Sequence, residues 1–129
     1  MDNLYISASP TTPEVSLQFD QNRLSMRGES YPENASVFYQ PIIEATMAYL
    51  QKCSNKMIEV NISLGYFNSS STKYLFNFFD ALNKAASDNN HITLNWYYDD
   101  EDETILEFGE DLKEDFRSLD YHSYPIETA

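Results

Sequence analysis

The chain has 129 residues, of which 42% are hydrophobic, and its formal net charge is −13. We expect a single domain over residues 1–129, because the length suits one core and the hydrophobic content is well above that of disordered segments. The 21 acidic residues against eight basic ones would repel phosphate backbones and anionic lipids, which argues against nucleic-acid and direct membrane binding and leaves proteins as the expected partners.

The first third of the chain predicts an antiparallel hairpin. Apolar and polar residues alternate over 15–19 and again over 24–26, which indicates two half-buried strands. The short segment Asp20 to Asn22 between them has the composition of a turn. The segment 4–7 is expected to add a short edge strand.

A helix is predicted from about Asn34 to Lys52. Pro41 lies within this range and lacks the N–H group of a regular helix, so either the helix begins close to Phe38 or its axis kinks at the proline. The predicted apolar face consists of Phe38, Ile42, Ala45 and Tyr49.

The second half of the chain alternates strands with helices. Residues 57–64 and 92–98 have the period of strands, and 123–127 is expected to form a short edge strand. The strand–helix–strand unit over 57–98 predicts parallel pairing of its two strands. A helix in this unit presents Leu75, Phe78, Phe79, Leu82 and Ala86, and a third helix presents Ile105, Leu106, Phe108 and Leu112.

Polar residues alternate with apolar ones in every predicted strand, so one face of the sheet is expected to be covered and the other more polar. The sequence therefore predicts an α/β fold, a two-layer sandwich in which a mixed sheet of about five to six strands carries helices mainly on one face. No apolar run approaches the length of about 18 residues for a membrane span, and residues 1–10 lack a signal-peptide pattern, so we expect a cytoplasmic protein.

No catalytic or metal-binding pattern is present in the sequence. The two histidines, His91 and His122, stand outside any nucleophile–base spacing and are expected to be satisfied or solvated. The three glycines are scattered rather than grouped into a phosphate-binding loop. The lone Cys53 excludes an internal disulfide and is expected to be a buried, inert thiol. We therefore expect a protein that is not an enzyme and needs no cofactor or metal.

The acidic run 99–103 precedes the third helix. Carboxylates suit hard cations, but the run lacks the spacing and glycine turn of a calcium loop. Acidic side chains also favour the positive end of a helix dipole. The preferred interpretation is a solvated helix cap, with a partner-facing charged patch as the alternative.

Four hydroxyl side chains, Ser69 to Thr72, stand between a predicted strand and a predicted helix. One interpretation is structural: Ser69 or Ser70 caps the helix and the others are polar filler. The run also follows the carboxyl end of a strand in a crossover unit, where α/β sheets place ligands. A phosphoryl group there would meet free N–H groups and a helix dipole, so a reversible phosphorylation switch is the functional interpretation.

Two segments carry a resemblance to a known family. "RGESYPENASVFYQPIIEATMAYL" (27–50) and "YFNSSSTKYLFNFFDAL" (66–82) resemble the SiaC-type regulatory phosphoproteins of bacteria, and the resemblance extends over essentially the whole chain. It implies a fold like the STAS domains of anti-sigma-factor antagonists. It also implies a switch protein that a cognate kinase phosphorylates, that a metal-dependent Ser/Thr phosphatase dephosphorylates, and whose unphosphorylated form engages a diguanylate cyclase in cyclic di-GMP signalling.

In the family that the chain resembles, the phosphoacceptor is often a threonine directly after the asparagine of this motif. The resemblance therefore places the phosphoacceptor on Ser69, with Ser70 and Ser71 as alternatives. The residues that it suggests for partner binding are Tyr31, Pro32, Glu33, Asn68, Ser70 and Lys73. Two competing functions stay open at this point. One is a small-ligand or anion-binding domain, or an enzyme, that uses the same hydroxyl cluster, and the other is a scaffold subunit without a switch.

Overall fold

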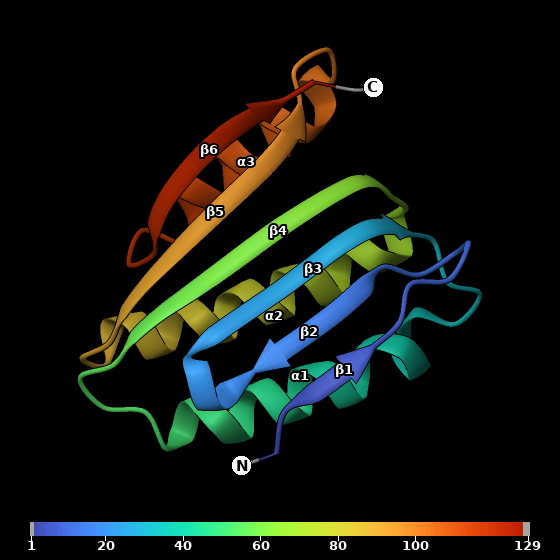
Figure 1. Cartoon of the computed structure of the whole chain (residues 1–129). Helices are drawn as coiled ribbons and strands as arrows, with labels where there is room; N and C mark the ends of the chain where they lie inside the picture. Colours follow the sequence, from blue (N-terminus) through green and yellow to red (C-terminus); the bar gives the residue numbers. More distant parts are fainter. Residues whose placement is uncertain (1, 128–129) are drawn as a thin grey trace.

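The computed structural model describes residues 2–127 (Figure 1). These residues form one six-stranded sheet, in which the spatial order of the strands is the same as their order in the chain. The strands are β1 (Leu4–Ile6), β2 (Glu14–Gln18), β3 (Arg23–Ser30), β4 (Met57–Phe67), β5 (His91–Asp99) and β6 (Asp120–Ile126). The helices are α1 (Ala35–Gln51), α2 (Ser69–Ser87) and α3 (Glu103–Asp115), and a 3-10 turn, η1 (Phe19–Gln21), joins β2 to β3.

The sheet is mixed. Strands β1, β2 and β3 pair antiparallel, whereas β3, β4, β5 and β6 pair parallel. The predicted hairpin is confirmed, and Asn22 closes its turn in the left-handed region with φ 54°. The predicted parallel pairing of 57–64 with 92–98 is confirmed, as are both edge strands.

All three helices lie on the same side of the sheet (Figure 1). The connections β3–α1–β4, β4–α2–β5 and β5–α3–β6 each lead to the next parallel neighbour. Crossover connections between parallel strands have the same handedness. When each one leads to the next strand on the same side, their helices lie on one face of the sheet. The predicted two-layer α/β sandwich is therefore confirmed, and no helix within residues 2–127 is long and apolar enough to cross a bilayer.

The core lies between the helices and the covered face of the sheet. Trp96 of β5 is the largest fully buried side chain, and its indole Nε1–H donates to the carbonyl of Ile105 in α3 at 3.0 Å. The ring of Phe108 stacks on Trp96 at a centroid distance of 5.6 Å. This cluster joins α3 to the sheet. The predicted apolar face of α2 is confirmed by the burial of Leu75, Phe78, Phe79 and Leu82.

Helix α1 runs from Ala35 to Gln51, which confirms the predicted range of about Asn34 to Lys52. Pro41 lies inside the helix, so the alternative of a start close to Phe38 is wrong. Its buried face includes Tyr39 and Thr46, whereas Phe38 and Ala45 are only partly buried. The polar Thr46 is tolerated in the core because its hydroxyl donates to the Ile42 carbonyl at 2.8 Å.

Three smaller expectations can be compared with the structure. Cys53 is partly rather than fully buried, and its thiol donates to the Tyr49 carbonyl. The helix cap expected from the acidic run is confirmed at Asp102, whose Oδ1 accepts from the Ile105 N–H at 3.2 Å. The two histidines are exposed, and each places its Nε2 beside one oxygen of the Asp120 carboxylate.

Candidate functional site

The hydroxyl run begins helix α2 directly after the end of β4. Asn68 is the N-cap residue, with extended backbone angles of φ −86° and ψ 173°. Its side-chain Oδ1 accepts from the backbone N–H of Ser71 at 2.9 Å. Asparagine is among the strongest N-cap residues, because its short side chain reaches the free N–H groups of the first turn. The interpretation that Ser69 or Ser70 caps this helix is therefore wrong.

Ser71 is fully buried, with 0% of its surface exposed. Its Oγ lies 2.9 Å from the Oγ of Ser30 and donates to the Ser30 carbonyl at 3.2 Å. The Ser30 hydroxyl is also hydrogen-bonded to the hydroxyl of Tyr39. Ser30, Tyr39 and Ser71 form a buried hydroxyl cluster that joins the end of β3 to α1 and α2.

The buried hydroxyl cluster is neutral. Burial raises the pKa of Tyr39, while hydrogen bonds from Ser30 and Ser71 oppose this change only in part. The carbonyl of Ser30 accepts a second hydrogen bond, from the backbone N–H of Asn68 at 3.0 Å. Buried polar groups that satisfy one another in this way hold the chain in one arrangement. The start of α2 is therefore fixed against the end of β3.

The remaining hydroxyls are at the surface or part-buried. Ser70 donates to the Asn68 Oδ1 at 3.2 Å, and Thr72 donates to the Asn68 carbonyl at 3.1 Å. Ser69 is exposed, and its hydroxyl has no hydrogen-bond partner within residues 2–127. Of the four hydroxyls in the run, that of Ser69 alone is both exposed and unengaged in this part of the chain. It is the first residue of α2.

The segment after β3 lies beside the start of α2. The register pairs Glu29 with Tyr66 and Ser30 with Phe67, so the two motif segments found in the sequence are neighbours in space. Tyr31 and Tyr66 are 38% and 50% exposed, and their rings make an edge contact at a centroid distance of 5.8 Å. We call this contact the Tyr31–Tyr66 pair.

The sequence did not single out Tyr66 as a candidate. The alternation of 57–64 gave no signal for it, because it puts Tyr66 on the same side as the buried Ile62 and Leu64. Tyr66 is exposed in the structure because the register between β3 and β4 shifts at this point and leaves Gly65 without a partner residue.

The residues that were expected to bind a partner differ in their exposure. Glu33, Ser70 and Lys73 are exposed, and the Lys73 Nζ lies over the Tyr74 ring at 5.7 Å. Pro32 is buried and so presents little surface to a partner in this arrangement.

Comparisons with known proteins bear on this site. The family model for the SiaC family regulatory phosphoprotein matches residues 6–126. An uncharacterized protein of Pseudomonas aeruginosa strain UCBPP-PA14 is 31% identical over 115 residues, which cover 89% of this chain and 90% of that protein.

Two solved structures are similar as well. A chain in the crystal structure of the diguanylate cyclase SiaD in complex with its activator SiaC, from Pseudomonas aeruginosa, is 29% identical with a TM-score of 0.88. The similarity covers 95% of this chain and 99% of that one. The crystal structure of apo-SiaC from the same organism has 29% identity and a TM-score of 0.87, over 95% of this chain and 98% of that one.

The family match spans both motif segments and all six strands at least in part. It confirms the resemblance drawn from the residues, and it agrees with the prediction of a signalling protein that is not an enzyme. The chain therefore belongs to the SiaC family of regulatory phosphoproteins.

Proposed function

We propose that this protein is a phosphorylation-controlled partner switch whose phosphoacceptor is Ser69. The observation that carries the proposal is the difference between Ser69 and Ser71. Ser69 is exposed, and its hydroxyl is not engaged within residues 2–127, whereas Ser71 is fully buried and hydrogen-bonded to Ser30. A kinase can reach the first hydroxyl without opening the fold, and it cannot reach the second.

The position also suits a phosphoryl group. The first N–H groups of a helix have no intrahelical acceptor, and the helix dipole favours negative charge there. Because Asn68 caps the helix, the Ser69 side chain is released from that role. Phosphorylation adds about 1.5 to 2 negative charges. We expect it to change the charge of the surface beside the Tyr31–Tyr66 pair and to leave the core unchanged.

The proposed cycle has three partners. A cognate protein kinase phosphorylates Ser69, and a metal-dependent Ser/Thr phosphatase removes the phosphate. The unphosphorylated form binds and activates a diguanylate cyclase, and we place this cycle in the cytoplasm. Support for the cyclase comes from the similar chain found in the complex of SiaD with its activator SiaC. The exposed Tyr31–Tyr66 pair supplies apolar contact area for such a partner.

An anion-binding domain that uses the same hydroxyls is less well supported. The Ser71 hydroxyl is directed at Ser30 rather than at solvent, and Ser70 and Thr72 are bonded to Asn68. Three of the four hydroxyls are thus engaged within the protein and would have to exchange these bonds for a ligand.

The acceptor is tested by incubation with the cognate kinase and ATP, followed by intact-mass measurement and peptide mapping. The wild-type protein should gain one phosphoryl group at Ser69, and Ser69→Ala should gain none. Ser70→Ala is the matched control and should be phosphorylated like the wild type. Modification that maps to Ser70 or Thr72 in the wild-type protein would place the acceptor elsewhere.

The switch is tested by measuring binding to the cyclase. Ser69→Ala should bind like the wild type, and the protein phosphorylated on Ser69 should bind more weakly. Ser69→Asp should have an effect in the same direction but smaller, because aspartate has one charge and two oxygens where phosphate has nearly two charges and three oxygens. Thermal melts of each variant separate lost binding from lost folding. Equal binding by the phosphorylated and unphosphorylated proteins would rule out the switch.

A further inference from the structure

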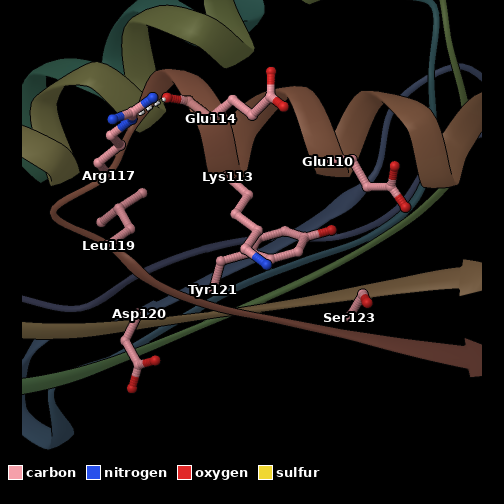
Figure 2. A pocket seen from close by; sticks show the side chains of 8 residues that line it. All are labelled: Glu110, Lys113, Glu114, Arg117, Leu119, Asp120, Tyr121 and Ser123. Atoms are coloured by element: carbon pink, nitrogen blue, oxygen red, sulfur yellow. Dashed lines mark hydrogen bonds between the residues drawn. The ribbon is translucent and has the colours of Figure 1, made fainter.

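A groove of about 690 Å³ lies between α3 and β6, away from the site described above. Figure 2 shows α3 along one side of this groove, carrying Glu110, Lys113 and Glu114, and β6 along the other, carrying Tyr121 and Ser123. The side chains of Tyr121 and Ser123 point toward the helix, and that of Asp120 points away from it. We call this feature the α3–β6 groove.

Strand β6 is an edge of the sheet, and within residues 2–127 its strand partner is β5 alone. The Ile126 carbonyl accepts from the Asp100 N–H at 3.0 Å, so the backbone groups of Ile126 are directed toward the β5 side. Along a strand, the N–H and C=O groups of successive residues point alternately toward one neighbouring strand and toward the opposite side, here called outward. The N–H and C=O groups of Tyr121 and Ser123 are therefore directed away from β5, where no strand of residues 2–127 pairs with them.

Pro125 supports this assignment. By the same alternation its backbone nitrogen is directed outward, and a proline at such a position removes no hydrogen bond from the existing ladder. It also limits the edge, because an added strand would find no N–H at Pro125. The free part of the edge is therefore Tyr121 and Ser123, the two residues of β6 whose side chains point into the α3–β6 groove. The opposite edge strand, β1, has only three residues.

The charge of the helix beside the groove favours a basic ligand over an acidic one. Helix α3 contains six acidic residues and one lysine, as its sequence ETILEFGEDLKED shows, and of these Glu110, Glu114 and Lys113 line the groove. Burial, together with the nearby carboxylate of Glu110, raises the pKa of Tyr121 to about 12. The negative charge of Glu110 therefore acts on a side chain inside the groove. Lys113 and Arg117 also line the groove, against the carboxylates of Glu110, Glu114 and Asp120, so the lining carries a formal charge of −1. The Arg117 Nε–H donates to the Glu114 carbonyl, which fixes that side chain beside the helix. A second copy of this chain would bring another net charge of −13 against the first.

From these observations we propose that the α3–β6 groove binds an extended, basic segment of a partner protein, which adds as a seventh strand to β6. Its backbone would exchange hydrogen bonds with Tyr121 and Ser123, and its alternate side chains would enter the groove beside Glu110 and Glu114. A groove bounded by a helix and an open strand edge is the arrangement in which strand addition gives affinity through the backbone and specificity through side chains. The proposal does not rest on Ser69, because β6 lies two strands away from β4.

The experiment begins with a phage-displayed library of random dodecapeptides, panned on the unphosphorylated full chain. Enriched peptides are then synthesised, and their affinities are measured by fluorescence anisotropy. We expect basic peptides with alternating apolar residues. Their binding should protect the amide hydrogens of Tyr121 and Ser123 from exchange with solvent, and it should not protect the segment around Ser69.

Two substitutions at one position provide the matched comparison. Ser123→Pro removes the outward N–H and should weaken binding by about tenfold or more, the loss expected for one buried hydrogen bond. Ser123→Ala keeps the N–H and should change the affinity by less than about twofold, because it removes no backbone hydrogen bond. The charge reversal Glu110→Lys should weaken binding of the basic peptides as well.

A change on the peptide side keeps the test valid if Ser123→Pro fails to fold. Methylation of the peptide nitrogens that face β6 should abolish binding to the wild-type protein, whereas methylation of the alternate nitrogens should not. The proposal is overturned if no peptide is enriched, if Ser123→Pro and Ser123→Ala bind equally well, or if the protected amides lie outside β6. Sedimentation of the chain alone covers another outcome, since a dimer that Ser123→Pro dissociates would assign the edge to a second copy.

Discussion

The hydroxyl oxygens of Ser30 and Ser71 lie 2.9 Å apart in the core, although the two residues are 41 positions apart in the chain. This contact ties the end of β3 to the first turn of α2, two residues after the proposed phosphoacceptor. The start of α2 therefore combines a surface serine that is free to be modified with a buried serine that holds the helix in place.

Because the roles of these serines differ, their alanine variants should differ in stability. Ser71→Ala removes a donor to the Ser30 carbonyl and should lower the free energy of unfolding by about 1 to 3 kcal/mol. Ser69→Ala removes an exposed hydroxyl and should change it by less than about 0.5 kcal/mol. Urea denaturation followed by circular dichroism measures both values. A larger loss for Ser69→Ala than for Ser71→Ala would contradict the burial pattern.

Asn68 should contribute to stability as the cap of α2. Asn68→Ala leaves the Ser71 N–H without its side-chain acceptor, and we expect a loss of about 0.5 to 2 kcal/mol in the free energy of unfolding. Asn68→Asp keeps an acceptor oxygen at the same place and should retain most of the stability. If alanine and aspartate at this position prove equally destabilising, the capping role is wrong.

Gly109 of α3 should not tolerate a side chain. A Cβ at this position would come within 2.5 Å of Trp96 Cδ1 and 2.6 Å of its Nε1, and would also meet the Tyr121 hydroxyl. Alanine is a better helix former than glycine by about 1 kcal/mol, but overpacking of a core costs about 1 to 3 kcal/mol. Because the Trp96 ring is buried and hydrogen-bonded to Ile105, we expect overpacking to dominate and Gly109→Ala to be destabilising.

The control for this prediction is Gly65→Ala. A Cβ at Gly65 would meet no atom within 4 Å, so this change should be neutral or slightly stabilising, by up to about 1 kcal/mol. Thermal or urea unfolding of both variants gives the comparison. Equal stability of the two would mean that α3 is not packed closely on Trp96.

The protein should lose stability in alkaline solution. Burial raises the pKa of Tyr39, and burial together with the Glu110 carboxylate raises the pKa of Tyr121 to about 12, whereas tyrosine in an unfolded chain titrates near about 10. Between about pH 10 and 12 the folded protein therefore holds protons that the unfolded chain has lost. The free energy of unfolding is at its full value below this range and falls as the pH rises through it.

Urea unfolding at intervals from pH 9 to about pH 12 tests this linkage. Tyr121→Phe removes one of the groups with a raised pKa, so its stability should fall less steeply with pH than that of the wild type. The same slope for both proteins would show that Tyr121 does not contribute.

Much of the fold follows from local patterns in the sequence. The alternation of 57–64 predicted β4, and the apolar stripe from Leu75 to Leu82 predicted the buried face of α2, both of which the structure confirms. The parallel pairing of β4 with β5 followed from the helix between them, because a crossover connection joins parallel neighbours. These predictions succeed because the period of a strand or helix is recorded in residues close to one another in the chain.

The two motif segments were also recognisable from the sequence, which identified the region of the site but not the role of each residue. Ser69, Ser70 and Ser71 are the same residue type, so the sequence could not distinguish their roles. The expected cap, Ser69 or Ser70, was wrong, because Asn68 caps the helix. Tyr66, which is exposed, was not among the expected partner residues, whereas Pro32, which is buried, was among them. The free edge of β6 could not be known before the order of the strands was known.

The sequence by itself determined the elements, their order and the family, because each depends on periodicity or on short motifs. The tertiary structure alone decided which hydroxyl is buried. Successive helix residues are turned by about 100°, so the rotation of α2 about its axis sends Ser71 toward the core and leaves Ser69 in solvent. That rotation is set by apolar packing against the sheet and by Ser30 and Tyr39, residues that are distant in the chain and become neighbours of Ser71 only when the protein folds.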